Sequence, residues 1–212
     1  EQEAPTSKSV RFKWREHVTN KVVIVTGGAQ GIGKTIAEEF QKQGALVCSI
    51  DKQPGVYFTG DLAQQDTLEK FAQKVITEYG HVDYLINNAL PLMKGIDNCS
   101  YEEFNYALKV GVTAPFYLAK LFQSYFSEGS AIVNISSSRD RMSQPQTESY
   151  TAAAGSSRSC FQCGIKEADR HKWHSACSYG TAQQGTGERF KDSGFPSEKI
   201  NNFSNETENT AR

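Results

Sequence analysis

The feature that most constrains the fold is a glycine-rich turn between a strand pattern and a helix pattern. Residues 21–27 read KVVIVTG, a run of β-branched apolar side chains that is typical of a buried strand. Residues 26–33 read TGGAQGIG, and residues 31–44 have the apolar spacing of a helix. Glycine permits a tight turn and lets the backbone approach a pyrophosphate, while the helix N-terminus supplies N–H groups. This order of elements predicts a dinucleotide-binding unit.

The alternation of strand and helix patterns continues to residue 153. Further strands are expected at residues 45–51, 56–61, 82–89 and 130–137, and further helices at residues 66–80 and 100–126. Strands that alternate with helices of this length imply right-handed crossovers. The pattern therefore predicts an α/β fold with a parallel, doubly wound sheet.

Each predicted helix has a more specific signature. The apolar side chains expected on one face are Ile32, Ile36 and Phe40 in the first helix, and Leu68, Phe71, Val75 and Tyr79 in the second. In the third, Ser100 is a candidate N-cap, and Glu103 three residues later would complete a capping box.

An acidic residue, Asp51, lies 18 residues after Gly33 at the expected end of the second strand. A carboxylate there can accept hydrogen bonds from the adenosine ribose hydroxyls and repels a 2′-phosphate. Because Gln30 in the turn is uncharged, NAD is favoured over NADP, although Lys52 is a cation beside the same site. The alternative is that the glycines only make a tight turn and Asp51 only caps a strand.

Further motifs follow in a specific order and spacing. They are Thr26-Gly27-x-x-x-Gly31-x-Gly33, Asp61-Leu62, Asn87-Asn88-Ala89, Ser137 and Tyr150. With these motifs, residues 21–153 resemble the short-chain dehydrogenase/reductase family. The resemblance implies a Rossmann-type sheet and NAD(H)-dependent hydride transfer with a small-molecule alcohol or carbonyl substrate.

The resemblance also implies roles for individual residues. Asp61 would contact the adenine, and Asn87, Asn88 and Ala89 would stabilise the central strand and flank the cofactor. The full set of cofactor-binding residues is Gly27, Gln30, Gly31, Ile32, Gly33, Asp51, Asp61, Leu62, Asn87, Asn88, Ala89 and Tyr150.

Catalysis is expected to use Tyr150 and Ser137. Tyr150 would supply or accept the proton at the substrate oxygen, and Ser137, 13 residues earlier, would hydrogen-bond that oxygen. Ser136 and Ser138 are the alternative assignments for the serine. An exposed serine without a catalytic role is the non-functional interpretation of Ser137.

Three positions depart from the family pattern. Ala154 stands where a lysine usually promotes ionisation of the tyrosine and holds the nicotinamide ribose, Gly111 stands where asparagine is common, and Leu90 stands where glycine is usual. Because the cation is missing, we expect weak or absent activity. The alternative function is a catalytically silent dinucleotide-binding or interaction protein.

The two ends of the chain differ in composition from the predicted Rossmann domain at residues 21–153. Residues 1–20 form a polar arm, and residues 154–212 form an atypical polar tail. From residue 155 onward the sequence contains no Leu, Val or Met. Such a segment buries too little apolar surface to offset its ordering entropy, so we expect much of it to be loop-like or disordered. The C-terminal strands of the family fold are expected to be missing or replaced.

The tail contains five residues of the types that bind zinc, namely Cys160, Cys163, His171, His174 and Cys177. A zinc-binding tail is therefore a second alternative function. Chance clustering is the favoured interpretation, so no metal site is predicted.

Charge and composition restrict the expected partners. The formal net charge of −1 gives no electrostatic reason to expect nucleic acid. No apolar stretch approaches the length that spans a bilayer, and residues 1–20 lack the apolar core of a signal peptide. Five cysteines are an odd number, which favours reduced thiols and a cytoplasmic location. A homo-oligomer is implied by the resemblance, although the altered C-terminal part argues against it.

Overall fold

The computed structural model describes residues 18–90, 93–137, 144–163 and 172–178. All of these residues belong to one compact unit, Glu1–Tyr179. In these described segments, no helix is long and apolar enough to cross a membrane.

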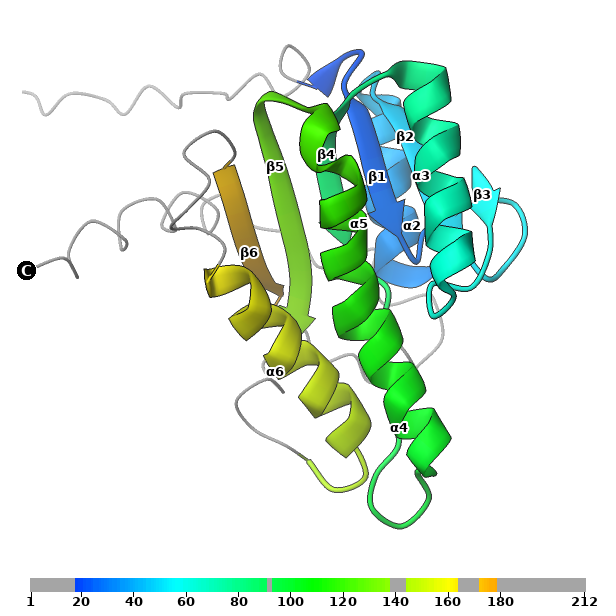
Figure 1. Ribbon diagram of the computed structural model, residues 1–212, viewed down its shortest axis with the longest axis vertical. Coiled ribbons are helices and arrows are strands. Elements are labelled where there is room, and N and C mark those ends of the chain that lie inside the picture. Colours follow the sequence, from blue (N-terminus) through cyan, green and yellow to red (C-terminus); the bar gives the residue numbers. More distant parts are fainter. Residues whose placement is uncertain (1–17, 91–92, 138–143, 164–171, 179–212) are drawn as a thin grey trace, which may run out of the picture. The chain divides into compact units, whose positions relative to one another are not determined.

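A six-stranded parallel sheet forms the centre of this unit, in the order β3-β2-β1-β4-β5-β6 (Figure 1). The strands are β1 (Val22–Thr26), β2 (Leu46–Asp51), β3 (Phe58–Thr59), β4 (Val82–Asn87), β5 (Phe126–Ser137) and β6 (Lys172–Ser178). This strand order is that of a Rossmann-type doubly wound sheet, so the predicted fold class is confirmed.

Helices cover both faces of the sheet, with α2 on one side and α3 and α5 on the other (Figure 1). The helical elements are α2 (Gly31–Lys42), α3 (Gln65–Tyr79), α4 (Tyr101–Leu108), the π-helix η1 (Lys109–Thr113), α5 (Ala114–Phe122), the 3₁₀-helix η2 (Gln123–Tyr125) and α6 (Glu148–Cys163). Because β1 is buried on both faces, its side chains alternate between two cores. Val22 and Ile24 join the core under α3 and α5, and Val23 and Val25 join the core under α2.

Most of the helix signatures are confirmed. Three of the four side chains expected on the inner face of α3 are buried, and Tyr79 is partly buried against the same core. Both hydrogen bonds of the capping box at Ser100 and Glu103 are present. Ile32 is an exception, since 48% of it is exposed in the first turn of α2, whereas Ile36 and Phe40 pack against the core.

The helix pattern at residues 100–126 corresponds to a continuous helical run, in which the π-helix η1 separates α4 from α5. Much of the polar tail was expected to be loop-like, and within it residues 172–178 form β6, which pairs in parallel with β5 from Ala131↔Lys172 to Ser137↔Ser178. The helix that contains Tyr150 extends to Cys163. Backbone hydrogen bonds to an existing strand favour β6 although its sequence has few apolar residues.

A buried carboxylate ties the start of β1 to the start of β4. Asp83 is 3% exposed and accepts hydrogen bonds from Lys21 Nζ and from the backbone N–H of Val22, both at 2.9 Å. His81 Nε2 lies 3.3 Å from the same carboxylate. The hydrogen bond to Asp83 raises the pKa of Lys21 above its ordinary value. These contacts join the amino ends of the two central strands, β1 and β4.

Replacing Asp83 with alanine should lower the free energy of unfolding by about 3 kcal/mol, because the buried N–H of Val22 loses its acceptor. Chemical denaturation of the variant measures this loss. Glu38→Ala is the matched control, since the Lys34–Glu38 pair is exposed and 3.8 Å apart. The control should change stability by less than about 0.5 kcal/mol. Equal effects of the two substitutions would show that Asp83 has no structural role.

Candidate functional site

The candidate site lies at the carboxyl ends of the central strands. The order of the sheet changes direction between β1 and β4, and the chain leaves β1 directly into the glycine turn and α2. In open α/β sheets, ligands bind outside the carboxyl ends of the strands at such a switch point.

The glycine turn is closely packed at Gly33. A Cβ on this residue would overlap the carbonyl oxygen of Gly27 and Nδ2 of Asn88. Gly27 has a φ of +71°, and its N–H donates to the carbonyl oxygen of Ile50 at 2.8 Å. A side chain at either position is therefore disfavoured, by collision at Gly33 and by backbone strain at Gly27.

The N-terminus of α2 has the properties of an anion site. Gln30 is the N-cap residue and makes no side-chain capping hydrogen bond, and the first turn of α2 contains no acidic residue. Gly31 has a φ of +56°, and a Cβ built on it would meet no atom within 4 Å. The turn therefore leaves open space beside N–H groups at the positive end of the helix dipole, which fits a pyrophosphate.

Asp51 lies across this turn at the end of β2. One carboxylate oxygen accepts a hydrogen bond from the N–H of Ala29 at 3.1 Å, and the other accepts from the N–H of Gln53 at 3.0 Å. A carboxylate has about four acceptor positions, so each oxygen can accept a further hydrogen bond from a ribose hydroxyl.

Asn88 connects the end of β4 to the glycine turn. The N–H groups of Asn88 and Ala89 both donate to Thr26 Oγ1, at 3.0 and 3.1 Å. Asn88 Nδ2 donates to the carbonyl oxygens of Thr26 and Gly27, at 3.1 and 3.3 Å. Asn87 does not contact the turn in this way. Its Nδ2 donates to Asn134 Oδ1 at 2.8 Å, which links β4 to β5 inside the sheet.

Asp61 and Leu62 lie beyond the short strand β3. Leu62 is buried in the core, whereas Asp61 accepts hydrogen bonds from the N–H of Ala63 and from Tyr106 Oη, each at 3.0 Å. Tyr106 is a residue of α4 that the sequence motifs did not identify. Because it is 45 positions from Asp61, no local pattern in the sequence could have indicated this contact.

The two predicted catalytic residues lie on consecutive elements. Ser137 ends β5 and is buried, and half-buried Tyr150 lies in the first turn of α6, which packs against β5. Ser136 is also buried at the end of β5. Ser138, the third candidate, lies outside the described residues. The roles of Ser137 and Tyr150 stay predictions.

The start of α6 is anchored to the segment that follows β4. The N–H of Lys94 donates to Ser149 Oγ at 3.0 Å, and the N–H of Ser149 donates to the carbonyl oxygen of Lys94 at 3.1 Å. Lys94 also forms an ion pair with Glu103 in α4. These contacts hold the backbone next to Tyr150 against two other elements.

Two of the three departures from the family pattern, Gly111 and Leu90, lie close to each other and to Ala153, the neighbour of the third departure in the sequence. A Cβ on Gly111 would lie 2.7 Å from the Cβ of Ala153 and 3.3 Å from Cδ2 of Leu90. Ala153 and Ala154 are 0% and 1% exposed. Small side chains therefore let η1 and α6 approach closely here, and Leu90 contributes apolar surface beside them.

Cysteine chemistry does not add to the site among the described residues. Cys48 and Cys99 are free thiols, and burial raises the pKa of Cys48 to about 12, which makes it an unreactive core residue. No group of three or more potential metal ligands occurs in the described residues. The side chains of the five candidate zinc ligands in the tail are not described, so the alternative of a zinc-binding tail lies outside the described part of the structure.

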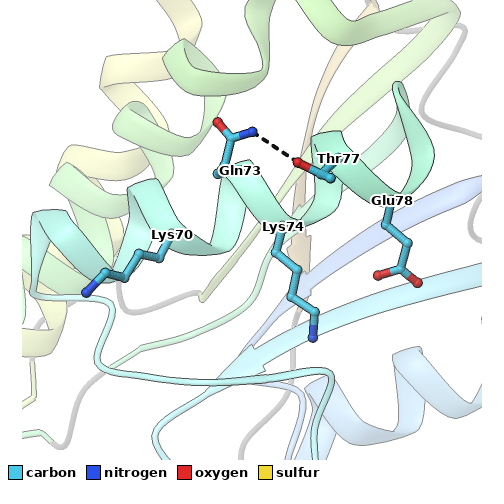
Figure 2. Close-up of a pocket in the computed structure, with 5 residues that line it drawn as sticks. All are labelled: Lys70, Gln73, Lys74, Thr77 and Glu78. Carbon is cyan, nitrogen blue, oxygen red and sulfur yellow. Dashed lines mark hydrogen bonds between the residues drawn. The ribbon is translucent and has the colours of Figure 1, made fainter.

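A shallow open depression lies on the outer face of α3, formed by Lys70, Gln73, Lys74, Thr77 and Glu78 (Figure 2). Its polar groups pair locally, since Gln73 donates to Thr77, Lys74 donates to the carbonyl oxygen of Tyr57, and Tyr57 Oη donates to Glu78. None of the predicted site residues belongs to it. The strand ends therefore remain the candidate site.

Comparison with known proteins identifies a family model. The model described as short chain dehydrogenase matches residues 21–182. The match extends beyond residue 153, where the sequence motifs placed the end of the resemblance, and it includes β6. The motif residues mark the site and not the later strand, so the family match is longer than the stretch that the motifs span.

Individual relatives support the same match. An uncharacterized oxidoreductase of Thermotoga maritima is 32% identical over 154 residues, which are 64% of this chain and 60% of that protein. The rat 15-hydroxyprostaglandin dehydrogenase, named for NAD(+), is 32% identical over 158 residues, covering 65% of this chain and 58% of that protein. The chain thus matches about 60% of the length of these curated relatives.

A solved structure also resembles the fold of this chain. Ligand-free aldohexose dehydrogenase from Thermoplasma acidophilum has a TM-score of 0.71 and 26% sequence identity. The similarity covers 77% of this chain and 68% of that chain. Fold and sequence comparisons therefore agree.

The packing of the glycine turn gives a test of the site. Gly33→Ala should lower the free energy of unfolding by about 3 kcal/mol, because the new methyl group collides with the backbone carbonyl of Gly27 as well as with the side chain of Asn88. Thermal and chemical unfolding measure the loss. Gly129→Ala is the control, with a φ of +74° and open space around the Cβ position. It should cost only about 1 kcal/mol of backbone strain, and a Gly33→Ala variant no less stable than this control would contradict the packing argument.

Proposed function

This chain belongs to the short-chain dehydrogenase family, and we propose that it binds NAD(H) and supports hydride transfer with an alcohol or carbonyl substrate. Members of the family use nicotinamide cofactors. The observation that carries the proposal is the open glycine turn at the uncapped N-terminus of α2, with the Asp51 carboxylate across it.

Different residues of this site would bind different parts of the cofactor. The glycine turn and the first N–H groups of α2 would hold the pyrophosphate. Asp51 would accept hydrogen bonds from the adenosine ribose, and Asp61 and Leu62 would line the adenine end. The residues proposed to contact the cofactor are Gly27, Gln30, Gly31, Ile32, Gly33, Asp51, Asp61, Leu62, Asn87, Asn88, Ala89 and Tyr150.

NAD is the proposed form of the cofactor. The Asp51 carboxylate would accept the free 2′-hydroxyl and repel a 2′-phosphate. A relative with 32% identity is named for NAD(+), which supports the same preference.

Tyr150 and Ser137 are proposed to act at the substrate oxygen. When bound, the nicotinamide supplies or accepts the hydride. Tyr150 would move the proton to or from the substrate oxygen, and Ser137 would hydrogen-bond that oxygen. Because Ala154 offers no ammonium group to favour the tyrosinate, we propose that turnover is slow.

A second candidate is a dinucleotide-binding protein without catalytic activity. The observation that favours it is the dense apolar packing of Leu90, Gly111 and Ala153 next to Ala154. Ala154 itself supplies no cation to Tyr150. Both candidates require nucleotide binding, so they differ only in turnover.

Nucleotide binding is tested by thermal unfolding of the chain with NADH or NADPH. At a concentration about 100-fold above its Kd, NADH should stabilise the folded state by about 2.7 kcal/mol, which raises Tm by roughly 5 °C or more. NADPH should raise Tm by less than NADH does. In Asp51→Asn, the Tm increases caused by the two nucleotides should be more alike, because the charge that repels the 2′-phosphate is removed. A Tm unmoved by either nucleotide would exclude both candidate functions.

Turnover separates the two candidates. Ala154→Lys should raise the rate of NADH formation from NAD by at least about tenfold, because the added ammonium favours the tyrosinate. The measurement is absorbance of NADH with a panel of secondary alcohols and polyols. Tyr150→Phe in the same background should remove the gain, and Ala153→Lys, at the neighbouring buried position, should not produce one. An Ala154→Lys variant that folds and binds NADH but gains no turnover would favour the silent protein.

A further inference from the structure

A cluster of three side chains lies at the adenosine end of the candidate site. Lys52 follows Asp51 at the end of β2, Asp61 follows β3, and Tyr106 is in α4. Lys52 Nζ donates a hydrogen bond to Tyr106 Oη at 3.0 Å and lies 3.5 Å from Asp61 Oδ2. Tyr106 Oη donates in turn to Asp61 Oδ1 at 3.0 Å, so the phenol connects the cation to the carboxylate.

The ring of Tyr106 adds a second contact to the same cation. Lys52 Nζ lies 5.0 Å from the centroid of the ring, within the range of a cation–π interaction. The hydrogen bond with Tyr106 is the main cause that raises the pKa of Lys52 above its ordinary value, and the charge of Asp61 acts in the same direction. Lys52 is therefore held as a cation by both neighbours.

The position of Lys52 gives this cluster a functional meaning. Asp51 is the residue proposed to face the adenosine ribose, and Lys52 is the next residue along the chain. A cation there is the group that would attract a phosphate on the ribose 2′-oxygen. Its ammonium group is instead paired with Asp61 and Tyr106.

We propose that Tyr106 is a specificity-determining positioning residue, which holds Lys52 against Asp61 and thereby favours NADH over NADPH. The inference rests on the proposed dinucleotide binding and adds to it a residue that the cofactor motifs do not contain. Tyr106 acts here through Lys52 and not by contact with the phosphate.

The strength of the cluster sets the size of the expected effect. The Lys52 side chain is 61% exposed and that of Asp61 is 27% exposed, so solvent screens their ion pair. An exposed pair of this kind contributes little alone, and the hydrogen bonds and the ring are what restrict the lysine. Removing the tyrosine should therefore release Lys52 without a large change in stability.

The chain provides a matched control at Tyr117 in α5. Tyr117 Oη donates to Glu69 at 2.6 Å, and Lys120 Nζ lies 5.9 Å from the centroid of its ring. The same types of contact thus occur at α3 and α5, away from the predicted cofactor residues. Leucine at either position removes the hydroxyl and the ring while retaining apolar contact with the core.

The experiment measures Kd for NADH and NADPH by isothermal titration calorimetry for the unmodified chain, Tyr106→Leu and Tyr117→Leu. In Tyr106→Leu, the affinity for NADPH relative to NADH should rise about fivefold, because the freed ammonium can reach the 2′-phosphate. Tyr117→Leu should leave the ratio unchanged. An unchanged ratio in Tyr106→Leu would overturn the proposal, whereas failure of the unmodified chain to bind either nucleotide would overturn the proposed function itself.

Lys52→Met identifies the cation responsible. In the Tyr106→Leu background, Lys52→Met should cancel the rise in NADPH affinity relative to NADH. In the otherwise unmodified chain it should change the NADPH affinity by less than about twofold, because Lys52 is already paired there. This single variant also tests the proposal if Tyr106→Leu fails to fold. A tenfold or larger loss of NADPH affinity in Lys52→Met alone would show that Lys52 already faces the nucleotide, which contradicts the proposal.

Discussion

The close approach of Gly33 to the carbonyl oxygen of Gly27 is the contact on which the rest of the site depends. Without a Cβ between them, the first turn of α2 packs directly against the turn that ends β1. Asn88 can then reach the carbonyl oxygens of Thr26 and Gly27, and this joins the end of β4 to the same turn. The glycine thus determines the relative positions of two strands and one helix N-terminus, which are the parts of a dinucleotide site.

Much of this arrangement could be predicted because it follows from local chemistry. A β-branched run predicts a buried strand wherever it occurs, and the capping box at Ser100 needs only Glu103 three residues later. The strand β6 could not be predicted in the same way. Its residues 172–178 lie in a polar segment, and their strand conformation depends on pairing with β5, which is distant in sequence. Composition averaged over a long tail therefore hid a short strand that another strand supports.

The candidate site also contains some features that the sequence predicts and others that depend on tertiary contacts. The glycine turn and Asp51 could be located from sequence because both lie at the ends of predictable strands. The contacts of Tyr106 could not, because the sequence does not specify which helix side chain reaches Lys52 and Asp61. The interruption of the helix pattern at η1 is also a tertiary effect, since Gly111 there lies against Ala153 of α6 and Leu90. Such π-helical turns are frequent at functional sites.

The end of the site that is proposed to bind the nucleotide and the end that is proposed to carry catalysis have separate structural supports. The former is held by Gly33 and by the hydrogen bonds of Asn88 to the turn after β1. The latter depends on the placement of α6 against Lys94 and η1. Ala154 lies in α6, and none of the hydrogen bonds that hold the glycine turn to Asn88 involves it. The slow turnover proposed for this chain is therefore compatible with an intact glycine turn.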